Sequence, residues 1–446
     1  MFFRFQTKLL LVVSLISALS IFAQTPKEVD LTQLDAIVGK QKFVNFGEDS
    51  HFMVEVHKFV ARAFPYLVEK KGFRVFVFEA AWGTEEAFRD FMNSNRTTVT
   101  GEESFYLNAF NSKYTVQMLI WIRDWNRKHP NDQIQITGYQ PEQPVTDFSA
   151  LWDFTEKSGK FASAGLKEKA KVCRAGTGDF KTNIDFVIDT SKRRRSGQAT
   201  FSKEERNSCN QAIDSIEKFT ETNKKELVRK NSRNAYLEAT AHLISLRVYL
   251  NTLTVVLDDS LVNKNPTFAE QQALQKKAYE EGDKGRFEIF EILRQTRFKN
   301  KKIFFWMHNW HAMKHASEVE AYGRGPSDPS MPKGTISIGE RMAKKYGKDL
   351  VVIGNIVPKA NCKNPICTPP PVPDNSLETP FQKVFANNPM LVDISKITSS
   401  NRDLPINKTG SLYADINQGT FNQVFLNRQF DAILYLPETT ATFEDK

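Results

Sequence analysis

The chain has 446 residues, of which 40% are hydrophobic and 25% are charged, as in an average globular protein. This balance excludes an intrinsically disordered chain, and the length allows one large domain or two to three ordinary ones. The formal net charge is +9. The basic run Lys192-Arg193-Arg194-Arg195 has no interleaved aromatic residue, so we predict a solvated loop and no nucleic-acid binding.

The N-terminus has the features of a signal peptide. Arg4 and Lys8 supply a basic start, and an apolar or small-residue run from Leu9 to Phe22 leads to a plausible cleavage site after Ala23. This run is shorter than the roughly 20 residues that a membrane-spanning helix needs. Residues 1–23 are therefore predicted to be removed on export. The rest, residues 24–446, is predicted to be a periplasmic or secreted domain without an integral membrane segment.

Short apolar runs rich in β-branched and aromatic residues predict buried strands. They are Phe43–Phe46, Phe73–Phe78, Ile134–Thr137, Ile303–Trp306, Leu350–Ile353 and Ala432–Tyr435. Helical patterns separate them, which favours an α/β fold with a mainly parallel sheet covered by helices. The region from about 150 to 295 has helical periodicity and no convincing strand, and it includes a clear apolar helix at Thr240–Leu257. We interpret it as a helical insertion between the two halves of the α/β core.

The first candidate site follows the Phe43–Phe46 strand, at Gly47-Glu48-Asp49-Ser50-His51. His51 is predicted to lie near a helix N-terminus and a strand's C-terminal end, where ligands bind in open α/β sheets. The positive end of a helix dipole disfavours the imidazolium form, and a neutral His51 could accept a proton from water as a general base. Glu48 could orient it. The alternative is that His51 only caps the helix.

The predicted helix that follows contains Pro65, which is expected to kink or interrupt it. Arg62 lies on the same polar stripe of this helix as His51. A cation near a catalytic site can bind a carboxylate or an oxyanion, so Arg62 is a candidate substrate-binding residue. A solvated helix face is the alternative.

Two more strand ends carry candidate site residues. Glu79 directly follows the Phe73–Phe78 strand, although it could simply cap the next helix. His308, His311 and His315 follow Ile303–Trp306 at intervals of three and four, so they are predicted to share one helical face. If neighbouring strands are parallel, His51, Glu79 and the His308–His311 pair meet at one edge of the sheet.

The four cysteines also bear on the compartment. In an oxidising compartment, Cys173, Cys209, Cys362 and Cys367 are compatible with two disulfides in any of three connectivities. We favour the local pairs Cys173–Cys209 and Cys362–Cys367. The sequence contains no Cys-x2-Cys spacing, so we do not predict a zinc site formed by these four cysteines. Residues 358–380 form a Pro-rich loop, which we interpret as a flexible segment or a lid.

At these residues the chain resembles the erythromycin esterase family. The resemblance is carried by Gly47-Glu48-x2-His51, by Glu79 and by His308-Asn309-x-His311, and is supported by Ile120–Asn126 and Phe430–Ile433. It implies a three-layer α/β hydrolase core and the opening of a macrolactone ring by activated water, as in macrolide antibiotic resistance. It also implies that His51 is the general base, that Glu48, Glu79 and His308 support it, and that His311 belongs to the same motif. The family uses no Ser nucleophile, and this chain has no Gly-x-Ser-x-Gly elbow.

The chain departs from the family pattern at two places. Gly282-Asp283 stands where the family often has an Arg-Asp pair, so one expected arginine is absent. Gln140 stands where an Asp is common. Both departures bear on the substrate and on the level of activity.

The leading hypothesis is a hydrolase without a metal cofactor that acts on a small-molecule ester or lactone. His51 removes a proton from water, Glu48 and Glu79 orient the base and the water, and His308 or His311 stabilises the oxyanion. A second hypothesis is a metal-assisted hydrolase with a divalent ion at His51, Glu79, His308 and His311. A third is a degenerate, non-catalytic protein that binds an envelope ligand.

Overall fold

The computed structural model describes residues 28–82, 84–100, 103, 107, 110–141, 144–157, 163–173, 203–256, 268–322, 333–361, 376–397, 404, 410–415 and 420–440. The predicted signal peptide, the basic run at 192–195, the predicted Cys362–Cys367 pair and the centre of the Pro-rich loop lie outside these residues.

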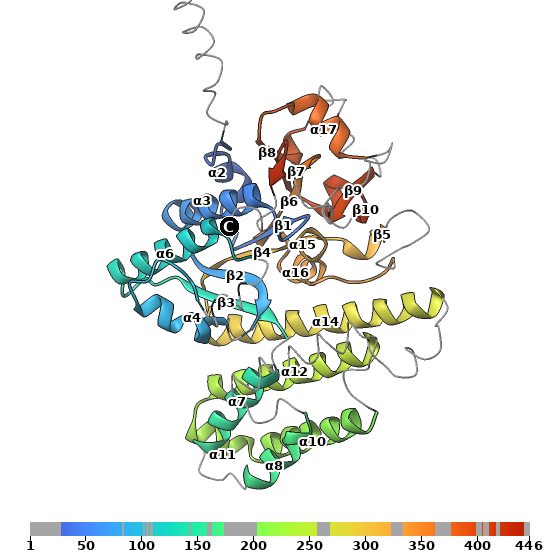
Figure 1. Cartoon of the computed structure of the whole chain (residues 1–446). Coiled ribbons are helices and arrows are strands. Elements are labelled where there is room, and N and C mark those ends of the chain that lie inside the picture. Colours follow the sequence, from blue (N-terminus) through green and yellow to red (C-terminus); the bar gives the residue numbers. More distant parts are fainter. Residues whose placement is uncertain are drawn as a thin grey trace, which may run out of the picture.

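A seven-stranded sheet forms the centre of the molecule (Figure 1). In spatial order its strands are β3 (Gln135–Gln140), β2 (Phe73–Ala81), β4 (Lys302–His308), β1 (Phe43–Glu48), β6 (Leu350–Ile356), β11 (Ala432–Tyr435) and β8 (Met390–Asp393). All neighbouring pairs are parallel except β11 and β8. The predicted fold class is therefore confirmed, and each of the predicted strand segments coincides with or overlaps one of these strands. The sequence analysis missed the antiparallel edge strand β8.

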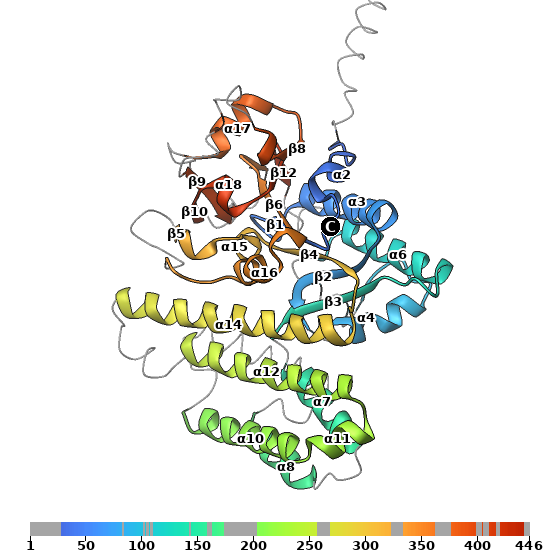
Figure 2. The ribbon, with the colours of Figure 1, turned by 180° about the vertical axis from the view of Figure 1, so that it is seen from behind.

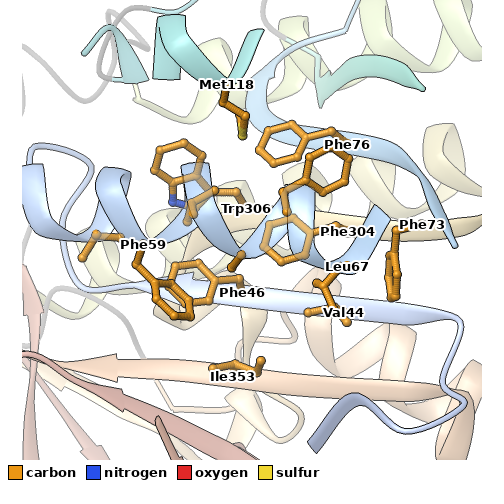
Figure 3. Close-up of a cluster of buried hydrophobic side chains, with 14 of the residues drawn as sticks. Val44, Phe46, Phe59, Leu67, Phe73, Phe76, Met118, Phe304, Trp306 and Ile353 are labelled. Carbon is orange, nitrogen blue, oxygen red and sulfur yellow. The ribbon is translucent and has the colours of Figure 1, made fainter. Parts of the chain in front are cut away.

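The strands bury side chains on both faces of the sheet, because helices cover both. Phe76, Phe304 and Trp306 point to one face, where they pack with side chains of α3 (Figure 3). The residues between them in sequence, such as Phe305, point to the opposite face, as the alternation of side chains in a strand requires. This double burial explains why the strands read as continuous apolar runs.

Different helices cover the two faces. The first face is covered by α2 (Gln33–Val38), α3 (Val54–Lys71), α4 (Thr84–Asn93) and α6 (Lys113–Lys128). The second is covered by α14 (Phe268–Thr296), α15 (Asn309–Ala312), α16 (Ile338–Tyr346) and α17 (Glu378–Phe385). Pro65 was expected to kink or interrupt its helix. It does not interrupt the helix, since α3 continues through Pro65 to Lys71. Gly72 ends α3 in the left-handed conformation, with φ +73°, which glycine adopts without a steric penalty.

Between β3 and β4 the described residues form only helices. They are α7 (Pro144–Glu156), α8 (Ser163–Ala170), the 3-10 turn η2 (Lys171–Cys173), α10 (Lys203–Thr222), α11 (Lys224–Lys230), α12 (Arg233–Val256) and α14. The predicted helix at 240–257 corresponds to the C-terminal part of α12 up to Val256. Figures 1 and 2 show these helices side by side below the sheet, with α14 nearest to it.

The helices α7 to α12 have a hydrophobic core of their own, and two features tie it together. The disulfide Cys173–Cys209 joins η2 to α10, as predicted. The buried Asp147 of α7 accepts hydrogen bonds from Ser245 Oγ of α12 at 2.6 Å and from Trp82 Nε1 at 2.8 Å. Because Trp82 follows β2, Asp147 links the helical region to the sheet.

The C-terminal part of the chain adds short elements around the sheet. β5 (Glu320–Tyr322), β10 (Thr420–Val424) and β9 (Gly410–Asp415) form an antiparallel sheet, and β7 (Ala360–Asn361) pairs with β12 (Thr439–Thr440). The remaining short turns are η3 (Ala316–Glu318), η4 (Gly347–Asp349), η6 (Ile394–Lys396) and α18 (Leu426–Gln429). None of the helices in the described part of the chain is long and apolar enough to span a membrane.

Candidate active site

Three adjacent strands bring the candidate residues to one edge of the sheet. β1 and β2 flank β4, all three run parallel, and Glu48 lies beside His308 in the β1–β4 register. Glu79 lies near the C-terminal end of β2, one residue after Phe78, which is paired with Trp306. The predicted meeting of distant strand ends is therefore present in the structure.

Glu48 and His51 form a close pair. His51 Nδ1 lies 2.6 Å from Glu48 Oε1, and the indole N–H of Trp306 donates to Glu48 Oε2 at 2.6 Å. The His51 side chain is 28% exposed, whereas Glu48 is fully buried. Burial raises the pKa of Glu48 to about 7, although the hydrogen bond from His51 opposes this shift. With Nδ1–H donating to Glu48, Nε2 of the neutral ring carries no proton and can accept one.

Glu79 is a buried carboxylate that is contacted from three other strand ends. The backbone N–H of His308 donates to its Oε2 at 2.6 Å, and Gln140 Nε2 donates to its Oε1 at 3.2 Å. His311 Nε2 lies 3.2 Å from Oε1, and His51 Nε2 lies 3.9 Å from Oε2. Burial raises the pKa of Glu79, but the charges of the facing histidines and Arg286 outweigh it and leave that pKa lowered.

His311 is held on its other side by Asp283 of α14. The distance from His311 Nδ1 to Asp283 Oδ2 is 2.9 Å, and the same carboxylate oxygen accepts the backbone N–H of Ile338 at 2.8 Å. Arg286 Nη1 donates to the other oxygen, Asp283 Oδ1, at 2.6 Å. Thus His51 and His311 each have a carboxylate behind Nδ1, and both direct Nε2 at Glu79.

His308 lies between these two pairs. Its ring centre is 6.0 Å from that of His51 and 6.4 Å from that of His311. His308 caps α15, because its Nδ1 accepts the backbone N–H of Trp310 at 3.3 Å. This bond fixes the His308 ring beside the cluster formed by Glu48, His51, Glu79, His311 and Asp283.

Gly47 allows the close approach on which this arrangement depends. A Cβ atom at this position would lie 2.5 Å from Asn309 Oδ1 and 2.9 Å from Asn309 Cα. Asn309 in turn exchanges hydrogen bonds with Asn355 of β6, at 3.1 Å through its Nδ2 and 3.2 Å through its Oδ1. The first turn after β4 is therefore fixed against both β1 and β6.

The sequence analysis missed His57, a buried residue that supports the position of His51. Its Nε2 lies 2.8 Å from the backbone oxygen of His51 and therefore donates to it, while Nδ1 lies 2.8 Å from Ser112 Oγ. Burial lowers the pKa of His57 to about 4, so the ring is neutral at pH 7. Its only sequence signal is a histidine among the apolar residues of α3, a pattern typical of a buried polar residue.

Two predicted placements need correction. Arg62, the candidate substrate-binding residue, is not brought to the cluster, since its guanidinium pairs with Glu28 at 3.2 Å and donates to the Val29 carbonyl at 3.4 Å. We therefore assign it no part in the site. His315 does not share a helical face with His308 and His311, because α15 ends at Ala312 and Met313 is no longer helical. His315 is half-exposed, and its Nδ1 lies 3.9 Å from Glu318.

The two departures from the family pattern have structural counterparts. Although position 282 is glycine, Arg286, one helical turn further on, lies beside Asp283 and within 3.2 Å of His311 Nε2. Gln140 donates to Glu79, which an ionised Asp at the same position could not do. The sequence analysis did not identify Arg286.

No group of three or more His, Cys, Asp or Glu side chains in the described ranges is arranged so that it could hold a metal ion. Around Glu79, the side chains predicted as metal ligands instead face hydrogen-bonding groups. Their arrangement suits proton transfer to and from a small molecule at the sheet edge.

A family model matches most of the chain. The family model described as Erythromycin esterase matches residues 68–439, a range that includes Glu79, His308 and His311 and begins after His51. The YbfO protein of Bacillus subtilis (strain 168), named as a candidate hydrolase, is 23% identical over 303 residues, which are 67% of this chain. The match spans 62% of the length of that relative.

Three solved structures share the fold over nearly the whole chain. A Bacillus cereus protein is 19% identical with a TM-score of 0.63, over 94% of this chain and 95% of that one. A succinoglycan biosynthesis protein is 15% identical with a TM-score of 0.66, over 94% and 95% of the two chains. A mutant of the erythromycin esterase EreC in its open conformation is 16% identical with a TM-score of 0.65, over 95% and 97%.

Proposed function

The chain belongs to the erythromycin esterase family, and from this premise we propose that it is a hydrolase that opens an ester or lactone with water activated by His51. The single observation that carries the proposal is the convergence of two histidine–carboxylate pairs, Glu48–His51 and Asp283–His311, on Glu79.

His51 is the proposed general base. Its Nδ1–H donates to Glu48, so Nε2 can take a proton from water, and Glu48 stabilises the imidazolium that forms. The 3.9 Å between His51 Nε2 and Glu79 Oε2 is too long for a direct hydrogen bond. A water that bonds to both atoms would be oriented by Glu79 and deprotonated by His51.

The other two histidines serve the second half of the reaction. Attack of the hydroxide on the carbonyl carbon forms a tetrahedral intermediate, and His308 or His311 stabilises its oxyanion. Collapse breaks the bond to the alkoxy oxygen, which takes up the proton held by His51 as it leaves, so that His51 is neutral again. The products are a carboxylic acid and an alcohol, joined in one molecule when the substrate is a lactone.

The experiment is a hydrolysis screen of simple esters, small lactones and 14-membered macrolactones, with erythromycin among them. His51→Ala should reduce kcat/KM on the active substrate by about 100-fold or more. His315→Ala is the matched control, because His315 lies in the same segment as His308 and His311 but outside the cluster. It should hydrolyse the substrate at the wild-type rate.

Near-normal hydrolysis by the His51 variant would overturn the assignment of the base. Equal silence of wild type and variant on every substrate would instead favour the non-catalytic binding protein. Hydrolysis of simple esters without erythromycin would separate the general activity from macrolide resistance.

The second hypothesis, a metal-assisted hydrolase, is tested by metal analysis, although the described side chains form no group that could hold an ion. Stoichiometric zinc or manganese in the purified protein, together with loss of activity to a chelator and its return on adding the ion, would favour that alternative. Activity that is unchanged after chelation favours water activation by His51 alone.

We also propose that the protein is exported. The signal peptide predicted at residues 1–23 motivates this, and the Cys173–Cys209 disulfide supports it, because such bonds persist in oxidising compartments. N-terminal sequencing of the protein from the envelope or the medium should begin at Gln24. A mature chain that begins at Met1 in the reducing cytoplasm would contradict the proposal.

A further inference from the structure

Arg286 contacts the Asp283–His311 pair of the candidate site. Its Nη1 is 2.6 Å from Asp283 Oδ1, 3.2 Å from His311 Nε2 and 3.4 Å from His311 Nδ1. One guanidinium nitrogen is thus close to both nitrogens of a single imidazole. This geometry places Nη1 over the face of the His311 ring and not at the end of one ring nitrogen.

The guanidinium is itself held in place. Asp283 and Arg286 are three residues apart on α14 and share a helix face, so the side chains meet without distortion. Asp283 is fully buried, and its second oxygen is bound by the backbone N–H of Ile338 at the start of α16. The Arg286 side chain is only 13% exposed. The helices α14 and α16 therefore fix the Asp283–Arg286 ion pair that contacts His311.

His311 needs this support because of its place in the proposed reaction. It must keep Nδ1 toward Asp283 while Nε2 faces Glu79 at 3.2 Å. Rotation of the ring about its Cβ–Cγ bond would break both contacts together. A planar group that lies against the ring prevents this rotation.

We infer that Arg286 is a positioning residue of the active site, which acts through His311 by holding its imidazole between Asp283 and Glu79. The inference rests on the proposed function for its effect on catalysis, but its effect on the ring can be measured without a substrate.

Arg286 variants test the inference against a matched control on the same helix. Arg286→Met keeps much of the side-chain length but removes the planar, charged group, and Arg286→Lys keeps the charge alone. Arg294 pairs with Glu291 at 3.3 Å through the same three-residue spacing, away from the histidines, so Arg294→Met is the control. Circular dichroism and thermal unfolding establish that each variant is folded.

The first measurement is a double-mutant cycle in kcat. Arg286→Met should reduce kcat on the order of 10- to 100-fold with a smaller change in KM, because it misplaces a reacting group. Arg286→Lys should recover little of this loss, and Arg294→Met should stay within about twofold of wild type. In a His311→Ala background, Arg286→Met should have almost no further effect. Additive losses in the cycle would overturn the inference.

The second measurement is the NMR spectrum of the imidazole nitrogens, recorded without substrate. The His311 signals should shift or broaden in Arg286→Met and stay in place in Arg294→Met, while the His315 signals stay unchanged in both. Unaltered His311 signals in a folded Arg286→Met protein would refute the positioning role. If the wild-type protein hydrolyses nothing in the screen, the proposed function fails, and this spectrum still decides the inference.

Discussion

Glu48 is a residue whose burial lowers stability for the sake of function. In the unfolded chain its pKa is near 4.5, and in the folded protein burial raises it to about 7. Between these values the folded state keeps a proton that the unfolded state has released. The free energy of unfolding therefore falls as the pH rises from about 4.5 to about 7, and the loss persists above that range.

Glu48→Gln should remove this loss because the amide has no charge to bury. We expect thermal unfolding at pH 8 to show a variant that is more stable than wild type by on the order of 1–3 kcal/mol, with the difference vanishing near pH 4. We expect kcat to fall by about 100-fold, since the imidazolium of His51 loses its counter-charge. Glu69→Gln, at an exposed position of α3, should change neither quantity. If the Glu48→Gln variant is less stable than wild type at pH 8, burial of the Glu48 carboxylate does not lower the free energy of unfolding.

The sequence predicted those site residues that follow apolar strands. Glu48, His51, Glu79, His308 and His311 all meet at the sheet edge, because parallel strands bring their C-terminal ends together. His57 and Arg286 were missed, since each belongs to a helix whose local pattern says nothing about which strand end it contacts. Arg62 was misplaced for a related reason. The polar stripe that includes His51 and Arg62 continues along α3, but the sequence does not show how far along this helix the candidate site extends.

At the level of elements, Gly285 determines how closely α14 approaches α12. A Cβ atom at this position would lie 2.2 Å from Val248 Cγ2. Gly285→Ala should lower the free energy of unfolding by about 1–3 kcal/mol, even though alanine favours a helix, because the two helices must separate. It should also lower kcat, since Asp283 and Arg286 lie on the same helix.

Val248→Ala should relieve the clash. Thermal unfolding of the double variant should show a favourable coupling between the two changes. Gly165→Ala in α8, where no atom lies within 4 Å of the added Cβ, should be neutral or stabilise by up to about 1 kcal/mol. Strictly additive effects of the 285 and 248 substitutions would contradict the close contact.

Elements buried on both sides were predictable from the sequence, and short or peripheral ones were not. The predicted strands stand out because each contains a run of mostly apolar residues. β8 is an edge strand that ends in Asp393, and the small β5–β10–β9 sheet lacks a comparable apolar run, so tertiary pairing and not local sequence sets these strands. The helix that was expected to include His315 ends at Ala312. The spacing of the histidines predicts a shared helical face but does not predict where the helix ends.

On the scale of the whole molecule, we expect the disulfide to stabilise the helical region without affecting the candidate site. Cys173 and Cys209 are separated by 36 residues, and both belong to the core of α7 to α12. In the chain-entropy model, loss of such a cross-link costs about 3–4 kcal/mol. The double change to Ser should lower the midpoint of thermal unfolding while kcat at 25 °C stays near the wild-type value.

A reducing agent should bring wild type down toward the unfolding midpoint of the double Ser variant. An unchanged midpoint without the disulfide would contradict the stabilising role. A proportional loss of kcat at 25 °C would mean that the sheet edge and the helical region cannot lose structure separately.

The helix α14 lies between the sheet and the remaining helices, with Phe290 and Leu293 in one core and Gly285 against Val248 of α12. An attempt to trim the protein to a minimal domain by joining β3 directly to β4 would therefore discard Asp283 and Arg286 along with the surplus helices. Keeping α14 without α12 would expose to water the surface around Gly285 that packs against Val248. The excisable module ends before α14, and any shortened enzyme needs a redesigned surface there.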